Sequence, residues 1–340
     1  PNIELTRRRF ITIAAAATAI GSPRAVSAST RLHEWRGTAL GAQATIRLAH
    51  PEESAARALL RRCVMEIERL ERILSLYLPD SAVCRLNEAG VLDAPPVEFV
   101  ELLGRAAAVS AATDGVFDVT VQPLWQRYAK HFASAEDDTA GPDVEDVLPL
   151  IDWRNVSIAA DRIAFRKAGM AVTLNGIAQG YITDRIADML RAEGMGSVLI
   201  DLGEIRSLGA HPAGHPWRVG IADPARPERI AARLDLTDLA LATSGGYGMR
   251  FEPSGRHNHL LDPRTGRSAP ALRSVSVIAQ DATTADAGST ALSLVDTSEM
   301  RHMLERLGAF EAHVLGPDGW TIIRSSLAGK WQARLGRQRV

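Results

Sequence analysis

The stretch that most constrains this chain is residues 276–291, where an apolar, β-rich segment passes through a polar turn into a helix of small residues. Asp286 and Thr290 stand four positions apart in that predicted helix, so their side chains lie one above the other on one face. A carboxylate and a hydroxyl placed in this way suit a hard cation such as Mg²⁺. Asp and Thr near a helix start also act as caps. The pair alone therefore leaves a metal site and helix capping both open.

The first residues are typical of an export signal and not of a folded element. Arg7, Arg8 and Arg9 form a twin-arginine pattern, and the apolar run after them ends before a small-residue cleavage site at Ala28. That run, of about ten residues, is too short to cross a bilayer. The sequence predicts a Tat signal peptide over residues 1–28, a periplasmic location and one domain over residues 29–340. Retention of the signal as an uncleaved anchor is the alternative.

Composition excludes several function classes. The formal net charge is −1 and no basic patch is present, which argues against a nucleic-acid partner. No second long apolar run predicts a membrane span in the mature form. The glycine-rich stretches lack the phosphate-loop and dinucleotide-binding patterns. Cys63 and Cys84 are compatible with a periplasmic disulfide, but Cys63 falls in a helical pattern and is predicted to be a buried thiol.

Hydrophobic periodicity predicts strands and helices that do not follow strict β-α-β alternation. This favours an α+β fold, a single domain with mixed or antiparallel sheets flanked by helices. Helices are predicted over residues 53–76, 81–90, 95–112, 123–132, 177–193 and 298–307, and after the strand 275–279. Strands are predicted over 33–48 (as two short strands or one bent strand), 156–158, 162–165, 171–174, 197–202, 217–221, 231–236, 240–243 and 258–261, with a last hairpin around 317–319. Residues 113–121 are predicted to be a turn into a short strand or extended segment, and 134–142 a loop.

The predicted strand at 258–261 carries two candidate histidines at its start. His257 and His259 alternate along the chain and therefore face opposite sides, which makes a zinc pair improbable. Asp262 opens the sequence D-P-R-T-G and is predicted to be a turn residue.

Several separated motifs, taken in order, resemble the ApbE family of FAD:protein FMN transferases and cover most of residues 37–295. Each motif is weak alone, but the ordered set is specific. The motifs are G-T-A-L-G (37–41), S-L-Y-L-P-D-S with R-L-N (75–87), T-D-G-V-F-D-V-T-V-Q-P-L (113–124), T-L-N-G-I-A-Q-G-Y (173–181), L-I-D-L-G-E-I (199–205), A-T-S-G-G-Y (242–247), H-L-L-D-P-R-T-G (259–266) and A-D-A-G-S-T-A (285–291).

The resemblance implies roles for individual residues. It implies that Asp286, Thr290 and the backbone carbonyl of Gly176 hold Mg²⁺. It implies that His259 lies beside the reacting phosphates, as a base or a phosphate ligand. The implied FAD-binding residues are Leu40, Tyr77, Val116, Phe117, Asp118, Thr173, Gln179 and Leu260. Asp118 is equally well explained as a cap or turn residue.

The implied activity is Mg²⁺-dependent transfer of FMN from FAD to a Thr or Ser hydroxyl of a client flavoprotein, with release of AMP. Thr173, Asn175 and Gln179 depart from the usual D-L-G-G-I-A-K-G motif of the family, in which an acid, a glycine and a lysine stand at these positions. These departures resemble the NosX-type subfamily linked to nitrous-oxide respiration. The client would then be the FMN-binding domain of a respiratory, NosR-like membrane protein. A non-catalytic periplasmic FAD-binding or assembly protein is the alternative, because loss of a lysine near phosphates could slow transfer.

Overall fold

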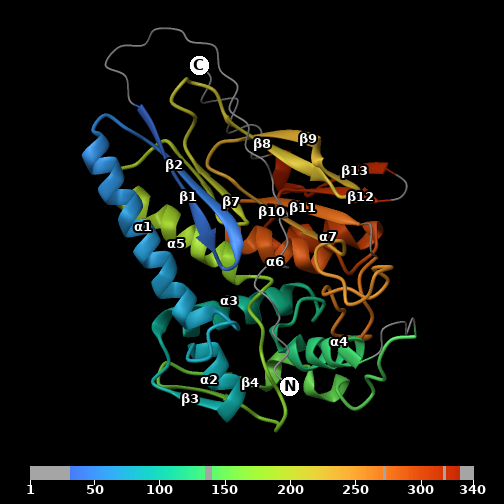
Figure 1. Cartoon of the computed structure of the whole chain (residues 1–340). Helices are drawn as coiled ribbons and strands as arrows, with labels where there is room; N and C mark the ends of the chain where they lie inside the picture. Colours follow the sequence, from blue (N-terminus) through green and yellow to red (C-terminus); the bar gives the residue numbers. More distant parts are fainter. Residues whose placement is uncertain (1–30, 135–139, 271–272, 317–318, 330–340) are drawn as a thin grey trace.

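The computed structural model describes residues 31–134, 140–270, 273–316 and 319–329, so the predicted signal peptide and part of the predicted 134–142 loop lie outside the described residues. Its centre is an eight-stranded sheet in which every neighbouring pair is antiparallel (Figure 1). In spatial order the strands are β1 (Arg31–Ala39), β2 (Ala42–His50), β6 (Val198–Asp201), β7 (Ile205–Leu208), β10 (Ala240–Gly245), β11 (Ser274–Ala279), β12 (Glu311–Gly316) and β13 (Gly319–Arg324).

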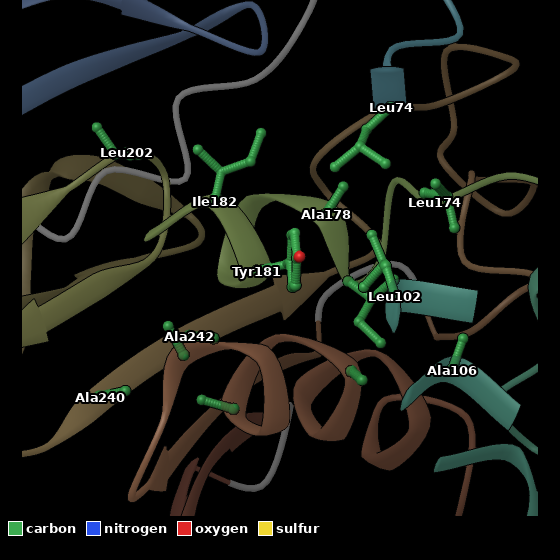
Figure 2. Close-up of a cluster of buried hydrophobic side chains, with 14 of the residues drawn as sticks. Leu74, Leu102, Ala106, Leu174, Ala178, Tyr181, Ile182, Leu202, Ala240 and Ala242 are labelled. Carbon is green, nitrogen blue, oxygen red and sulfur yellow. The ribbon is translucent and has the colours of Figure 1, made fainter. Parts of the chain in front are cut away.

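The two faces of this sheet have different covers. Four helices pack on one face, namely α1 (Glu53–Leu74), α5 (Ala178–Ala192), α6 (Ala282–Leu292) and α7 (Thr297–Leu307). The hairpin of β8 (Trp217–Asp223) and β9 (Arg226–Leu236) packs on the other. Strand β10 shows the alternation, since Ala240 and Ala242 join the helix-side core and Leu241 joins the hairpin side. Figure 2 shows Ala242 in one cluster with Tyr181 of α5.

A second, three-stranded sheet has the order β3 (Val91–Asp93), β5 (Arg162–Phe165) and β4 (Val156–Ile158). With it come α2 (Ala82–Ala89), α3 (Val97–Ala112), α4 (Gln122–Ser134) and the 3₁₀ turns η2 (Val119–Val121), η3 (Leu148–Leu150) and η4 (Trp153–Asn155). The α+β prediction is confirmed. Among the described helices, none is both long enough and apolar enough to cross a membrane.

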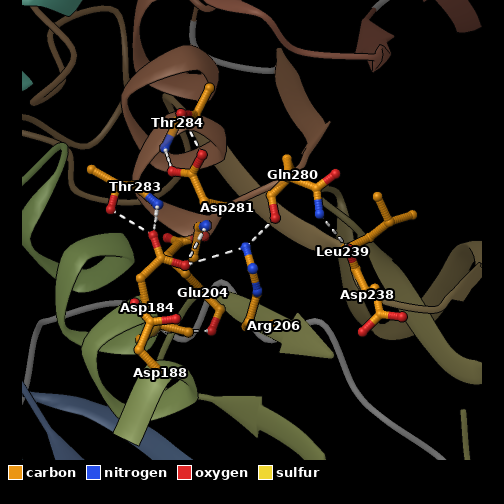
Figure 3. A network of polar contacts seen from close by, with 12 residues as sticks. Asp184, Asp188, Glu204, Arg206, Asp238, Leu239, Gln280, Asp281, Thr283 and Thr284 are labelled. Carbon is orange, nitrogen blue, oxygen red and sulfur yellow. Dashed lines mark hydrogen bonds and ion pairs between the residues drawn. The ribbon is translucent and has the colours of Figure 1, made fainter. Parts of the chain in front are cut away.

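Helix α6 is fixed at its N-terminus by side chains from two other elements (Figure 3). Asp184 of α5 accepts hydrogen bonds from the backbone N–H groups of Ala282 and Thr283, each at 2.8 Å, and from the Thr283 hydroxyl at 2.6 Å. Arg206 of β7 pairs with Asp184 at 3.4 Å and donates to the carbonyl of Gln280. The first turn of α6 therefore has its otherwise unpaired donors satisfied from α5.

Helices α5 and α6 cross closely because small residues meet at the contact. A Cβ placed on Gly180 would lie 2.3 Å from the carbonyl oxygen of Ala282 and 2.8 Å from the Cβ of Asp286. Both contacts are shorter than real Cβ atoms make. The absence of a side chain at Gly180 therefore sets the distance between the two helices.

Gly180→Ala is expected to lower the free energy of unfolding by about 1–3 kcal/mol, because backbone must move to admit the methyl group. Urea denaturation checks this. Gly104→Ala is the matched control, since Gly104 lies within α3 with no atom near its Cβ position. Gly104→Ala should raise the free energy of unfolding by about 0.5–1 kcal/mol, because alanine loses less backbone entropy than glycine when the helix folds. Equal effects of the two substitutions would contradict the close crossing.

Three predicted extended segments are wrong. Residues 171–174 form no strand, because the Asn87 amide takes the place of a neighbouring strand by bonding both the N–H and the C=O of Val172, at 2.7 and 2.8 Å. Residues 258–261 make only isolated bridges. The segment after Thr113 ends in a 3₁₀ turn, not a strand, because the Asp118 carboxylate caps the N–H of Thr120.

Most of the other predictions about single elements are confirmed, and two short strands were missed. The 33–48 region is two strands, with Leu40 and Gly41 in the turn at φ of 49° and 81°. Strands β3 and β7 were not predicted, since both are short. The helix predictions are confirmed to within a few residues. Both cysteines are free, and Cys63 is buried as predicted, with burial raising the pKa of its thiol to about 12.

Candidate active site

Two adjoining cavities open where α5, α6 and the loops after β10 meet. The first, which we call the α6 cavity, has a volume of about 160 Å³ and is lined by Asp286 and Thr290 of α6. The second, which we call the hairpin cavity, has a volume of about 130 Å³ and is lined by Leu40 and Ala42 of the β1–β2 hairpin. Both are also lined by Trp125, Asn175, Gln179 and His259, so the two form one cleft. A larger, more open hollow between β1 and α1 contains none of the predicted site residues.

Every predicted site residue lines this cleft. The α6 cavity collects Val116, Phe117, Asp118, Thr173, Gly176, Gln179, His259, Leu260, Asp286 and Thr290. The hairpin cavity adds Leu40 and Tyr77. Segments that are far apart in the sequence thus converge, although the role of each residue stays a prediction.

Capping does not explain Asp286 within its own helix. Asp281 is the N-cap of α6 and accepts from the N–H of Thr284 at 2.9 Å. Asp286 lies a full turn further on, and its Oδ2 accepts from the backbone N–H of Gly180 in α5 at 2.9 Å. The capping alternative for α6 is therefore wrong, and Asp286 joins the two helices at the floor of the cavity.

The proposed cation ligands are neighbours in space. A Cβ built on Gly176 would lie 3.0 Å from Thr290 Oγ1, so the Gly176 backbone runs directly beside that hydroxyl. Thr290 Oγ1 also lies 3.3 Å from Ser244 Oγ, which is 2.7 Å from Ser289 Oγ. The hydroxyls of Ser244 in β10 and Thr290 in α6 therefore lie together in the lining of the cavity that Asp286 also lines.

The cavity floor is electrostatically unbalanced. Asp286 is 3% exposed, and burial raises the pKa of its carboxyl to about 7. Glu204 is 7% exposed, and burial, followed by repulsion from Asp286 and Asp201, raises its pKa well above the usual value. Neither cavity has Lys or Arg among its described lining residues. Two buried carboxylates with no basic partner fit a divalent cation, which would neutralise both.

Such a cation would need mixed oxygen ligands. Within the described ranges, no three His, Cys, Asp or Glu side chains gather as a metal-binding group. Hard cations accept hydroxyl and backbone carbonyl oxygens as well as carboxylates. The residue types at 176, 286 and 290 therefore suit Mg²⁺ better than a metal that prefers nitrogen or sulfur.

His259 faces the cleft and His257 does not. The ring of His257 packs against Tyr128 and Phe132 at centroid distances of 5.7 and 5.1 Å, so the two histidines face opposite sides as predicted. Burial lowers the pKa of His259, which favours a neutral imidazole. Its Nδ1 lies against the backbone of Met249, 3.3 Å from the nitrogen and 3.1 Å from the oxygen. This leaves Nε2 available to a group in the cavity.

Three other predicted residues, Asp118, Gln179 and Thr173, make hydrogen bonds within the protein in the walls of the cleft. The Asp118 carboxylate accepts from the N–H and hydroxyl of Thr120, at 2.8 and 2.7 Å, and from the N–H of Trp153 at 2.9 Å. Both oxygens of the Asp118 carboxylate therefore accept hydrogen bonds from groups of the protein itself. Gln179 Nε2 donates to the carbonyl of Leu202 at 3.3 Å, and Thr173 Oγ1 accepts from the Asn175 N–H at 3.3 Å. These contacts shape the loops around the cavity.

The hairpin cavity is largely apolar and has an aromatic wall. Tyr77 is 41% exposed, and its hydroxyl accepts from Asn175 Nδ2 at 3.4 Å. Leu40 is held in the β1–β2 turn by a bond from its N–H to the Glu71 carboxylate. An exposed ring beside apolar side chains suits stacking against a planar ligand.

Sequence reasoning missed part of the lining. The additional polar or large lining residues include Trp125, Asn175, Glu204, Thr243, Ser244 and Met249. Asn175, Glu204, Thr243 and Ser244 lie inside the quoted motifs, so a signal was present for them. Trp125 directly follows a motif. Met249 carried no signal.

Comparison with known proteins supplies the remaining observation. The ApbE family profile matches residues 40–314. The chain belongs to the ApbE family. The predicted membership is thereby confirmed.

Curated relatives and solved structures of the ApbE family agree. The chain is 28% identical over 324 residues to the FAD:protein FMN transferase of Salmonella typhimurium, covering 90% of this chain and 91% of the relative. It is 30% identical over 289 residues to the enzyme of that name from Treponema pallidum, covering 77% and 78%. The ApbE protein of Thermotoga maritima has a TM-score of 0.75 at 28% identity, covering 88% and 99%, and the Pseudomonas stutzeri flavinyl transferase ApbE has 0.74 at 26%, covering 89% and 97%.

Proposed function

We propose that the protein is an FAD:protein FMN transferase, which moves FMN from FAD to a Thr or Ser hydroxyl of a client flavoprotein and releases AMP. The observation that carries the proposal is the convergence of the ordered family motifs on one cleft, with buried carboxylates at its floor and a neutral histidine in its wall. Relatives named for this activity match most of the chain.

The reaction needs a nucleophile, a leaving group and a place for one proton. The acceptor oxygen forms a bond to the flavin-side phosphorus of FAD, and the bond from that phosphorus to the bridging oxygen breaks. AMP departs with the bridging oxygen. His259 is the candidate base, because in the neutral tautomer whose Nδ1–H donates to the Met249 carbonyl, Nε2 carries the lone pair that takes the hydroxyl proton.

A Mg²⁺ ion fits the same site. Asp286, Thr290 and the carbonyl of Gly176 would hold it. It would supply positive charge to the pyrophosphate and to the departing AMP. The protein's own contribution is to hold these oxygens rigidly, through the bonds of Asp286 to α5 and of Thr290 to Ser244.

The decisive test is incubation with FAD, Mg²⁺ and a candidate acceptor domain. AMP release measured by chromatography, together with the mass of an FMN phosphoester on the acceptor, is the expected result. An acceptor whose target Thr or Ser is changed to Ala is the control. FAD binding without AMP release, in the presence of an acceptor that another transferase modifies, would overturn the proposal in favour of a flavin carrier.

Tyr77→Ala is expected to weaken FAD binding by roughly 1–3 kcal/mol if the ring stacks on the ligand. Calorimetric titration of FAD checks this. Tyr77→Phe keeps the ring and removes the hydroxyl that accepts from Asn175, so it should bind nearly as well as the unmodified protein if stacking dominates. Equal losses in both variants would assign the effect to the hydroxyl and contradict stacking.

We also propose export to the periplasm and a client in a respiratory membrane flavoprotein, of the kind linked to nitrous-oxide reduction. The twin-arginine pattern supports the first, and the departures at Thr173, Asn175 and Gln179 support the second. Changing Arg7 and Arg8 together to Lys should leave precursor in the cytoplasm, as fractionation and immunoblotting would show. Normal export of that double variant would contradict the Tat interpretation.

A further inference from the structure

Glu204 is a buried carboxylate that the proposed reaction has not yet used. It lies in the tight turn between β6 and β7, directly after Gly203, which adopts a φ of 102°. Its side chain lines the α6 cavity together with Asp286 and Thr290. A glutamate that is 7% exposed costs free energy unless its charge is paired or its oxygens are bonded.

The hydrogen bonds of Glu204 are incomplete. The backbone N–H of Thr243 supports its carboxylate, but Oε2 is buried with no hydrogen-bond partner among the described residues. Among the described residues no ion pair joins Glu204 to the neighbouring Arg206, whose Nη1 pairs with Asp184 and donates to the Gln280 carbonyl (Figure 3). Repulsion from Asp286 and Asp201, both of the same sign, adds to burial in raising the pKa of Glu204.

A buried carboxylate oxygen without a hydrogen-bond partner, on a residue that lines the same cavity as a second buried carboxylate, suits a cation ligand. We propose that Glu204 is a further carboxylate ligand of the divalent cation held by Asp286 and Thr290. The inference rests on the proposed function, since it concerns the same cation. It brings the site to two carboxylates, a hydroxyl and a carbonyl, a set of hard oxygen donors that Mg²⁺ and Mn²⁺ accept.

The net charge at the cation position follows from this assignment. With Asp286 alone, a divalent ion would keep one excess positive charge. With Glu204 also bound, the ion is neutralised before the substrate phosphates arrive. Affinity for the free ion rises with the number of ligand charges. The protein should therefore bind the cation without FAD, and Glu204 should account for much of that affinity.

The test is titration of purified protein with Mn²⁺, followed by electron paramagnetic resonance of the free ion, with and without FAD. Glu204→Gln keeps the shape and removes the charge, and it should weaken Mn²⁺ binding at least about tenfold. Asp201→Asn is the matched control. Asp201 is a nearby carboxylate that lines neither cavity, and Asn can still accept the Gly203 N–H at its Oδ1. It should leave Mn²⁺ affinity within about twofold if only direct ligands matter.

Thermal unfolding in EDTA tests whether Glu204 binds the cation or instead stabilises the fold. Glu204→Gln should not lower the melting temperature without metal, because it removes an uncompensated buried charge. A lower melting temperature with unchanged Mn²⁺ affinity would overturn the inference. So would equal losses for Glu204→Gln and Asp201→Asn, which would indicate a general field effect, or no Mn²⁺ binding by the unmodified protein.

The same titration distinguishes this inference from the proposed reaction. If Asp286→Asn weakens Mn²⁺ binding and Glu204→Gln does not, the ligand role of Glu204 is wrong while the transferase proposal stands. If Glu204→Gln loses affinity but no acceptor releases AMP, the ligand assignment is supported and the transferase proposal fails, since the titration does not depend on turnover.

Discussion

Asp286→Asn is expected to reduce metal-dependent AMP release by at least about 10²-fold, because it removes the charged cation ligand at the floor of the cleft. The fold should persist. Asn keeps an oxygen that can accept from the Gly180 N–H, which donates to Asp286 Oδ2 at 2.9 Å. The substitution also removes a buried charge that has no basic partner among the described residues that line the cavity. Turnover is followed by AMP chromatography, and stability by thermal unfolding of the same samples.

Two further variants calibrate this result. Asp281→Asn changes a carboxylate on the same helix that caps the N-terminus and does not line the cavity. Asn caps nearly as well as Asp, so activity should stay within about twofold. Thr290→Val keeps the shape and removes the hydroxyl, and should reduce turnover less than Asp286→Asn does, because a neutral ligand contributes less. Full activity of Asp286→Asn at saturating Mg²⁺ would contradict the metal assignment.

Asp184→Ala is expected to lower the free energy of unfolding by about 3–5 kcal/mol. It leaves the buried Arg206 without its carboxylate and the first turn of α6 without acceptors for the N–H groups of Ala282 and Thr283. Burial, with repulsion from Asp281, raises the pKa of Asp184 even with Arg206 beside it. The pair is therefore a weak source of net stability but costly to break. Urea denaturation measures the loss.

The control lies one turn further along α5. Asp188 pairs with Arg191 on the exposed face at 2.7 Å, and Asp188→Ala should cost no more than about 0.5 kcal/mol. Asp184→Ala combined with Arg206→Met should recover part of the loss, since both charges then leave together. A loss below about 1 kcal/mol for Asp184→Ala would show that α6 is anchored by packing alone.

Much of the fold could be read from local pattern. Helix α1 has apolar residues at helical spacing over its whole length, and α2 is bounded by Ser81, whose hydroxyl accepts from the Cys84 N–H, and by the left-handed Gly90. These signals act within a few residues of each other, so sequence contains them. The predicted 171–174 strand failed because its partner is the Asn87 side chain, which is distant in the sequence.

In the candidate site, too, some features follow from local sequence and others from contacts between distant segments. The sequence by itself determined that Asp286 and Thr290 share one face of a helix, and the ordered motifs determined the family, because both depend only on residue order. Only the tertiary structure decided that Glu204 and Asp286 lie close enough to repel each other, that Asp281 and not Asp286 caps α6, and that Gly180 sets the helix separation. Burial, charge coupling and steric contact arise between segments far apart in the chain. Their strength depends on distances that residue order does not fix.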